Sequence, residues 1–193
     1  MAFWTSHLAD PKRKYRFKLT MFEEVAWYVK SVSAPSYEIT SVEHSFSDHT
    51  FYFPGKIKWS DVEVTLVDPA GDDDVVHKTL ELIRLAGYKL PKREELDSTG
   101  QNSAFLTFTK EQLVNNNGKV TLETQDAEGN VVEKWTLNNA FITNVKFGDF
   151  DYSSDDLREI SLTVKYDWAS CTITGGRSDV SNKSYFEKQA GTS

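Results

Sequence analysis

The chain has 193 residues, of which 39% are hydrophobic, 26% charged and 13% aromatic, and its formal net charge at pH 7 is −7. This length and composition predict one folded domain, residues 1–193, with a substantial core. The acidic balance argues against a surface that binds nucleic acid through its phosphates. The single cysteine, Cys171, excludes an internal disulfide framework and a cysteine-only metal site.

Residues 1–14 are predicted to form an extended N-terminal arm, and they lack the hydrophobic region of a signal peptide. No apolar run in the sequence approaches the length of a membrane span, so we expect assembly in a reducing cytoplasm without membrane insertion. The arm leads into the one basic run of the chain, Lys12, Arg13, Lys14 and Arg16. We interpret this run as a solvated or partner-facing segment, with local phosphate contact as the alternative.

Alternating side chains predict a β-hairpin near the N-terminus. Residues 15–22 alternate between apolar and polar side chains, and residues 25–33 form the returning strand, which Pro35 ends. Residues 57–67 predict another strong strand. Its apolar face changes phase along the strand, which indicates a bulge near residues 60–61.

Between these strands, residues 36–56 are predicted to form a long hairpin arm that protrudes from the domain and turns at Ser47 and Asp48. A single small domain could hardly bury all the aromatic side chains of this arm, which are Phe46, Phe51, Tyr52 and Phe53. The arm either folds back on its own sheet or buries these side chains against a neighbouring subunit. We favour the neighbouring subunit, because large apolar patches on a protein surface usually mark interaction sites.

The middle of the chain predicts the one long helix, at residues 72–86. Its apolar side chains follow helical spacing, its first turn is acidic and Gly87 is expected to stop it. A polar connection follows at residues 88–103. The next predicted elements are a short strand at 104–109, a turn of helix at 110–117, and strands at 119–124 and 131–137 around a hairpin turn at 126–130.

Residues 138–168 predict the most regular feature, two antiparallel strands joined by a polar turn. One face of the second strand is apolar and carries Ile160, Leu162, Val164, Tyr166 and Trp168. The opposite, solvated face carries Glu159, Ser161, Thr163, Lys165 and Asp167. Beyond Trp168 the chain is predicted to become irregular, and we expect the C-terminal extension, residues 169–193, to become ordered only against a neighbouring subunit.

The sequence contains no recognisable reaction centre, so we expect no enzyme, no metal site and no cofactor. His44 and His49 flank the turn of the arm, but no third metal ligand is identified. The run 72–74 of aspartates is explained by a helix N-terminus. The aspartates of the 149–156 turn are typical of turns, and we do not interpret them as paired catalytic carboxylates. Neither a Gly-x-Ser-x-Gly elbow nor a phosphate-binding loop is present.

The order of these segments resembles the tail tube proteins of contractile-tail bacteriophages, a family that is similar to the tube protein of type VI secretion. The resemblance covers residues 15–86 and 119–168. It rests on YRFKLTMFEEVAWYVKSVSAP, on the long arm, on GKIKWSDVEVTLVDP leading into a helix, and on WTLNNAFITNVKFGDFDYSSDDLREISLTVKYDWA. It implies a mainly β fold, an antiparallel β-sandwich or half-barrel with one flanking α-helix and a protruding hairpin arm.

The resemblance also implies a structural role in a phage virion. Members form hexameric rings that stack into the hollow inner tail tube, a conduit for genome ejection. The implied partners are further copies of the chain, the sheath protein, the tape-measure protein, and baseplate and tail-terminator proteins. DNA would pass through in transit without sequence-specific binding.

Candidate surfaces for this role follow from the predicted elements. Inter-subunit contacts are expected at Phe46, Phe51, Tyr52, Phe53, Tyr185 and Phe186. The lumen is expected to be acidic and polar, with Glu159, Ser161, Thr163, Lys165 and Asp167 as lumen-facing candidates. Because residues 88–103 and 169–193 look extended relative to a minimal member, a baseplate-proximal tube initiator stays open. A soluble β-sandwich that binds a ligand is the alternative from another class.

Overall fold

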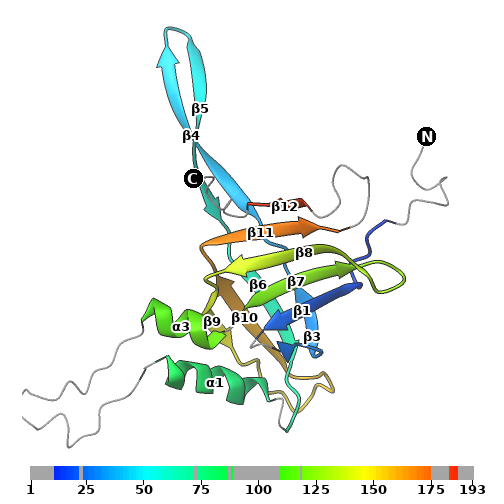
Figure 1. Ribbon diagram of the computed structural model, residues 1–193. Coiled ribbons are helices and arrows are strands. Elements are labelled where there is room, and N and C mark those ends of the chain that lie inside the picture. The colour runs from blue at the N-terminus through cyan, green and yellow to red at the C-terminus, as the bar shows by residue number, and fades with distance from the viewer. Residues whose placement is uncertain are drawn as a thin grey trace, which may run out of the picture.

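The computed structural model describes residues 11–21, 24–71, 74–86, 88, 109–117, 119–174 and 183–186. These residues form three antiparallel sheets and two helices (Figure 1). A six-stranded sheet and a four-stranded sheet make up the body, and a two-stranded ribbon rises from it. The prediction of a mainly β, antiparallel fold with a protruding hairpin is confirmed. The predicted strand at 104–109 lies outside the described residues except for Thr109, which is not in a strand.

The six-stranded sheet has the strand order β12-β11-β8-β7-β1-β2. Its hairpin β7–β8 forms around the predicted turn, where the carboxylate of Asp126 accepts hydrogen bonds from the amides of Glu128 and Asn130. The strands are β1 (Phe17–Met21), β2 (Glu24–Val25), β7 (Val120–Gln125), β8 (Val131–Asn138), β11 (Trp168–Ile173) and β12 (Lys183–Tyr185).

The four-stranded sheet has the order β3-β6-β10-β9. Its strands are β3 (Val29–Val32), β6 (Val62–Val67), β9 (Phe141–Lys146) and β10 (Glu159–Lys165). The predicted antiparallel pair over 138–168 is confirmed as β9 and β10, with Ser161 opposite Lys146. Alternation along β10 places Ile160, Leu162 and Val164 in the core, as predicted.

The predicted N-terminal hairpin is wrong in its pairing. Only the two-residue β2 returns beside β1, whereas β3 belongs to the other sheet and pairs with β6. The chain turns at Trp27 and Tyr28, and the amide of Val67 donates to the carbonyl of Tyr28 at the entry to β3. Stacking in two facing sheets lets β1 and β3 bury their apolar faces in one core, which side-by-side pairing would not.

The region around Ser60 is also more than a bulge. The long ribbon strand ends at Trp59 and β6 begins at Val62, so the change of apolar phase marks the point where the chain passes from one sheet to another. The amide of Ser60 donates to the carbonyl of Ser36 there, at 2.9 Å. A phase change in sequence therefore indicated a boundary between two strands.

The expectation that the chain becomes irregular after Trp168 is wrong. Trp168 starts β11, which crosses to the six-stranded sheet and pairs with β8 over six positions. Ala169 and Cys171 are buried, whereas Trp168 is 38% exposed and does not share the apolar face of β10. Small apolar residues at every second position suit a strand that packs close to the opposite sheet. Lys183–Tyr185 then adds a further strand within the same chain, against our expectation of order only beside a neighbour.

The core fills the space between the two body sheets. Leu19 and Met21 of β1 face Val64 and Leu66 of β6 in one cluster of buried side chains with Ile160. Helix α1 (Val75–Leu85) adds Val75, which is fully buried. Asp74 is the N-cap of this helix, with its carboxylate accepting from the amide of His77 at 2.8 Å. The helix thus begins three residues later than predicted, and its first turn contains no acidic residue.

A second helix, α3 (Lys110–Asn117), contacts both α1 and β9, and the two helices lie on the side of the body away from the ribbon tip (Figure 1). The helical turn predicted at residues 110–117 is confirmed as α3, so two helices flank the body where the family resemblance implied one. Gly87, residues 72–73, and all of the 88–103 connection except Tyr88 lie outside the described residues.

Candidate assembly surfaces

The hairpin arm consists of β4 (Tyr37–Phe46) and β5 (His49–Trp59) and projects well beyond the body (Figure 1). The turn lies at the predicted position, and Ser47 adopts a positive φ of 55° in it. Every residue of β4 is exposed, and on β5 only Thr50 and Trp59 are partly covered. The structure therefore leaves the predicted aromatic side chains of the arm between 47% and 73% exposed.

A bulge divides the arm into a base and a distal half. Ile39 pairs with Ile57, but Ser41 pairs with Pro54, so β5 contains one more residue than β4 in this interval. The hydroxyl of Thr40 accepts from the amide of Lys56 at 3.0 Å. Gly55 lies so close that a Cβ atom there would be 2.4 Å from the same hydroxyl oxygen. A glycine is therefore required where the two strands come together.

Cross-strand pairing sorts the side chains of the distal half onto two faces. Paired residues share a face, so the pairs Val42–Phe53, His44–Phe51 and Phe46–His49 form one continuous apolar and aromatic face. Phe46, Phe51 and Phe53 are 73%, 47% and 57% exposed. The opposite face is polar and carries the pairs Glu43–Tyr52 and Ser45–Thr50. The four predicted contact residues are thus divided, with Tyr52 on the other side of the ribbon.

The base of the arm packs against its own chain. The ring of Trp59 lies 5.4 Å from that of Tyr37, 5.6 Å from that of Phe186 and 5.9 Å from that of Tyr166. Phe186, which we predicted as an inter-subunit contact, therefore touches the arm of its own chain and is still 48% exposed. Burial raises the pKa of Tyr166 to about 12. These contacts fix the direction in which the arm leaves the body.

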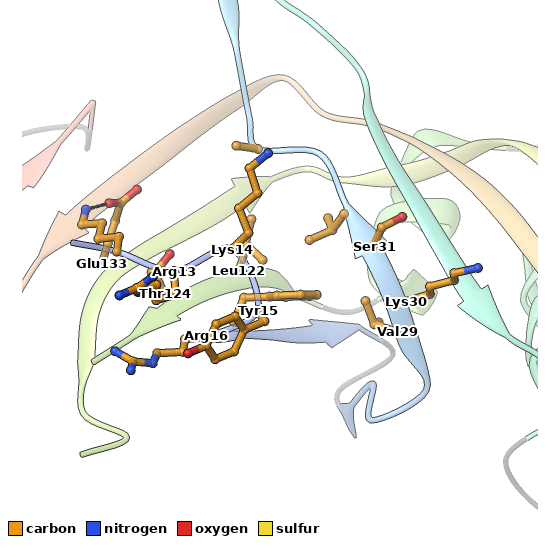
Figure 2. Close-up of a pocket in the computed structure, with 14 residues that line it drawn as sticks. Arg13, Lys14, Tyr15, Arg16, Val29, Lys30, Ser31, Leu122, Thr124 and Glu133 are labelled. Carbon is orange, nitrogen blue, oxygen red and sulfur yellow. Dashed lines mark hydrogen bonds and ion pairs between the residues drawn. The ribbon is translucent and has the colours of Figure 1, made fainter. Parts of the chain in front are cut away.

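A groove of about 880 Å³ opens between the two body sheets, between the segment before β1 and the edge strand β3 (Figure 2). Its apolar lining comes from Phe17, Val29, Val32, Ala34 and Leu122. Its basic lining comes from Lys12, Arg13, Lys14, Arg16 and Lys30. Glu133 is the one acidic residue in the lining, and it forms an ion pair with Lys12. The basic run singled out in the sequence is thus part of a hollow with an apolar floor.

The outward face of the four-stranded sheet is polar. Ser161 lies between Lys146 and Thr65, and Thr163 lies between Asn144 and Glu63. Two of its charges form ion pairs, Glu159 with Lys30 and Lys165 with Asp61. This face is therefore electrically balanced rather than strongly acidic.

Asp167 does not belong to β10. It lies in the turn before β11, where its carboxylate accepts from Lys110 at 2.6 Å and from the side-chain amide of Asn139 at 2.7 Å. These contacts lower the pKa of Asp167. We therefore assign this residue a role in joining α3 to the turn.

The two outer strands of the four-stranded sheet, β3 and β9, pair with no further strand among the described residues. Three successive antiparallel pairings separate them, so β3 and β9 run in opposite directions. A β9 strand from another copy placed beside β3 would continue the antiparallel alternation. Such open edges are avoided in isolated proteins because they template further pairing.

The described residues contain no group of three or more side chains that could hold a metal ion. His44 and His49 share the apolar face of the arm with aromatic partners, Phe51 and Phe46. The carboxylate of Asp151 accepts hydrogen bonds from the amide and the hydroxyl of Ser153, and these bonds lower the pKa of Asp151. This local bonding is typical of an aspartate in a turn. No described helix is long and apolar enough to cross a membrane.

No protein-family model matches the sequence, and no curated protein matches it either. Solved structures resemble its fold. The cap that terminates the tube of the anti-feeding prophage (AFP) is 17% identical, with a TM-score of 0.60, and covers 90% of this chain and 100% of its own. A chain of the sheath–tube complex of the extracellular contractile injection system PVC is 16% identical, with a TM-score of 0.60. The match covers 90% of this chain and 99% of the PVC chain. A chain of the AFP baseplate is 14% identical, with a TM-score of 0.59. The match covers 85% of this chain and 97% of the baseplate chain.

Proposed function

Because this fold is shared by chains of the tube-terminating cap, the sheath–tube complex and the baseplate of contractile injection systems, we propose that the protein is a structural subunit of the inner tube of a contractile tail. In the specific form that we propose, it is the tail tube protein of a phage. It forms hexameric rings that stack into a hollow conduit for DNA, inside a sheath and around a tape-measure protein. The proposed role is not enzymatic.

The observation that carries the proposal is the pair of open edges on the four-stranded sheet. Because β3 and β9 run antiparallel, copies arranged head to tail can extend this sheet from subunit to subunit without changing its pairing pattern. A head-to-tail contact that closes produces a ring, and closure removes every open edge of the sheet. Six copies would contribute the four-stranded sheets of one ring.

In this arrangement we assign Glu159, Ser161, Thr163 and Lys165 to the lumen, on the outward face of the closed sheet. The side chains on this face are polar, and Glu159 and Lys165 are ion-paired. A polar lumen of low net charge would give a passing polyanion no attractive contact to hold it. This revises the expected acidic lumen to a balanced one.

The structure of the assembled state tests the proposal directly. Size-exclusion chromatography and negative-stain electron microscopy of the purified chain should reveal rings or tubes with a central channel. A chain that stays monomeric at every concentration and ionic strength would contradict the proposal and favour a ligand-binding β-sandwich.

A second candidate is a tube-ending or tube-initiating subunit of the same particle. It is supported by the fact that the cap and baseplate chains match this chain as well as a chain of the sheath–tube complex does, with TM-scores of 0.59–0.60. Electron microscopy separates the two roles: a repeating subunit forms long tubes by itself, whereas an end subunit stops at single rings.

A further inference from the structure

The groove and the distal arm have complementary surfaces on one chain. The groove has an apolar floor, and its lining contains five basic side chains and one acidic side chain, with Lys12 ion-paired to Glu133 and Lys30 to Glu159. The lining therefore keeps a net positive charge. The distal half of the arm, residues 41–54, contains three phenylalanines, Glu43 and Asp48, and no lysine or arginine. An apolar, acidic ribbon thus matches an apolar, basic hollow in both hydrophobicity and charge.

The groove is not filled by the arm of its own chain. No residue of β4 or β5 is among its lining residues, and the arm extends away from the body (Figure 1). The bulge at Gly55 and the aromatic base around Trp59 fix this direction. Any arm that enters the groove therefore comes from another molecule.

We propose that the groove between β1 and β3 is the receptor for the distal arm of a second copy of this chain. The face with Phe46, Phe51 and Phe53 packs on the apolar floor, and Asp48 at the tip lies near the basic rim formed by residues 12–16. This inference rests on the proposed function and adds to it the surface that receives the arm.

One geometric detail supports a one-sided docking. The aromatic side chains of the distal half lie on a single face, while the other face carries Glu43, Ser45, Thr50 and Tyr52. An arm buried on both sides would need apolar residues on both faces. A ribbon with one apolar face instead suits an open groove, with its polar face left to solvent.

Cross-linking of a mixture of two variants, each with one added cysteine, tests the proposal. His49→Cys places a thiol at the tip on the phenylalanine face, and Ser31→Cys places one on β3 in the groove. The matched control is Ser45→Cys, one cross-strand pair further from the tip and on the polar face. Native Cys171 is buried, and burial raises the pKa of its thiol, so the wild-type chain serves as the background for its reactivity.

With a short bis-maleimide, the mixture of His49→Cys and Ser31→Cys chains should give a dimeric product several-fold more abundant than the mixture of Ser45→Cys and Ser31→Cys. Isotope labelling of one partner shows that the link joins two chains. Equal yields from both mixtures, or links from the arm to a different surface, would overturn the groove as receptor. Electron microscopy of the same samples distinguishes failure of this inference from failure of the proposed function. If rings form but the cross-link does not, the groove is not the receptor of the arm. If no assembly forms at all, the role as a tube subunit is rejected as well.

A charge exchange gives an independent test that leaves the aromatic face intact. Lys14→Glu should lower the extent of assembly, and combining it with Asp48→Lys should restore it, with both variants keeping the circular dichroism of the wild type. No recovery in the double variant would contradict the proposed approach of the arm tip to the basic rim.

Discussion

The strongest quantitative prediction concerns Phe51 and Phe53 on the distal arm. Complete burial of a phenylalanine side chain is worth about 1.5–3 kcal/mol. The two side chains are 47% and 57% exposed in the isolated chain, so about half of that gain is still available for a partner. Each therefore contributes roughly 1 kcal/mol to docking, and the pair roughly 2 kcal/mol. A change of this size corresponds to about a 30-fold weaker contact.

The double variant Phe51→Ala/Phe53→Ala should raise the concentration needed for assembly by about this factor per contact, and by more when contacts repeat around a ring. The measurement is sedimentation velocity or electron microscopy across a dilution series. Thermal unfolding of the monomer should be unchanged, because neither side chain belongs to the core. Tyr52→Ala, on the opposite face, is the matched control and should have a smaller effect.

Two results would refute this reasoning. Assembly of the double variant at wild-type concentrations would indicate that the apolar face stays in solvent. A double variant that fails to fold would indicate that the arm supports its own domain, contrary to the exposed positions of both side chains.

Three further predictions concern the stability of the chain. Truncation after Cys171 removes Thr172 and Ile173 of β11 and all of β12, so the melting temperature of the monomer should fall. An unchanged melting temperature would instead indicate that the C-terminal extension is ordered only by neighbouring subunits. Tyr166 has its pKa raised to about 12 by burial, so the folded state holds its proton where the unfolded state has lost it. The free energy of unfolding should therefore decrease between about pH 10 and pH 12, by at most roughly 2–3 kcal/mol, and Tyr166→Phe should reduce this dependence in alkaline urea titrations. Gly55→Ala should open the bulge against Thr40, seen as faster amide hydrogen exchange in β4 and β5 but not in β10.

Local patterns predicted several elements well, because the information lies within a few neighbouring residues. Period-two alternation identified β10 and its buried Ile160, Leu162 and Val164. Turn-forming residues located the tips of the arm and of the β7–β8 hairpin. The many aromatic residues flanking Ser47 indicated an arm that its own domain leaves exposed.

The errors arose where the decisive partner is distant in sequence. Val29–Val32 alternates as a strand, but its pairing with β6 rather than β1 depends on which sheet can bury its apolar face. Trp168 continues the alternation of β10 in sequence, yet the chain turns at Asp167. Trp168 is therefore the first residue of β11, which pairs with β8 in the other sheet. The change of apolar phase near Ser60 marks one passage between sheets, but the alternation through Asp167 gives no such local signal.

The sequence by itself determined the strands β7, β8, β9 and β10, the position of the arm and its aromatic character, because alternation and turn chemistry act over a few residues. Only the tertiary structure decided that Tyr52 lies on the other face from Phe51 and Phe53, and that the basic run joins β3 around a groove. The physical reason is that a face is set by the register between two strands, and a groove by the distance between two sheets. Both depend on packing among residues that are far apart in the chain.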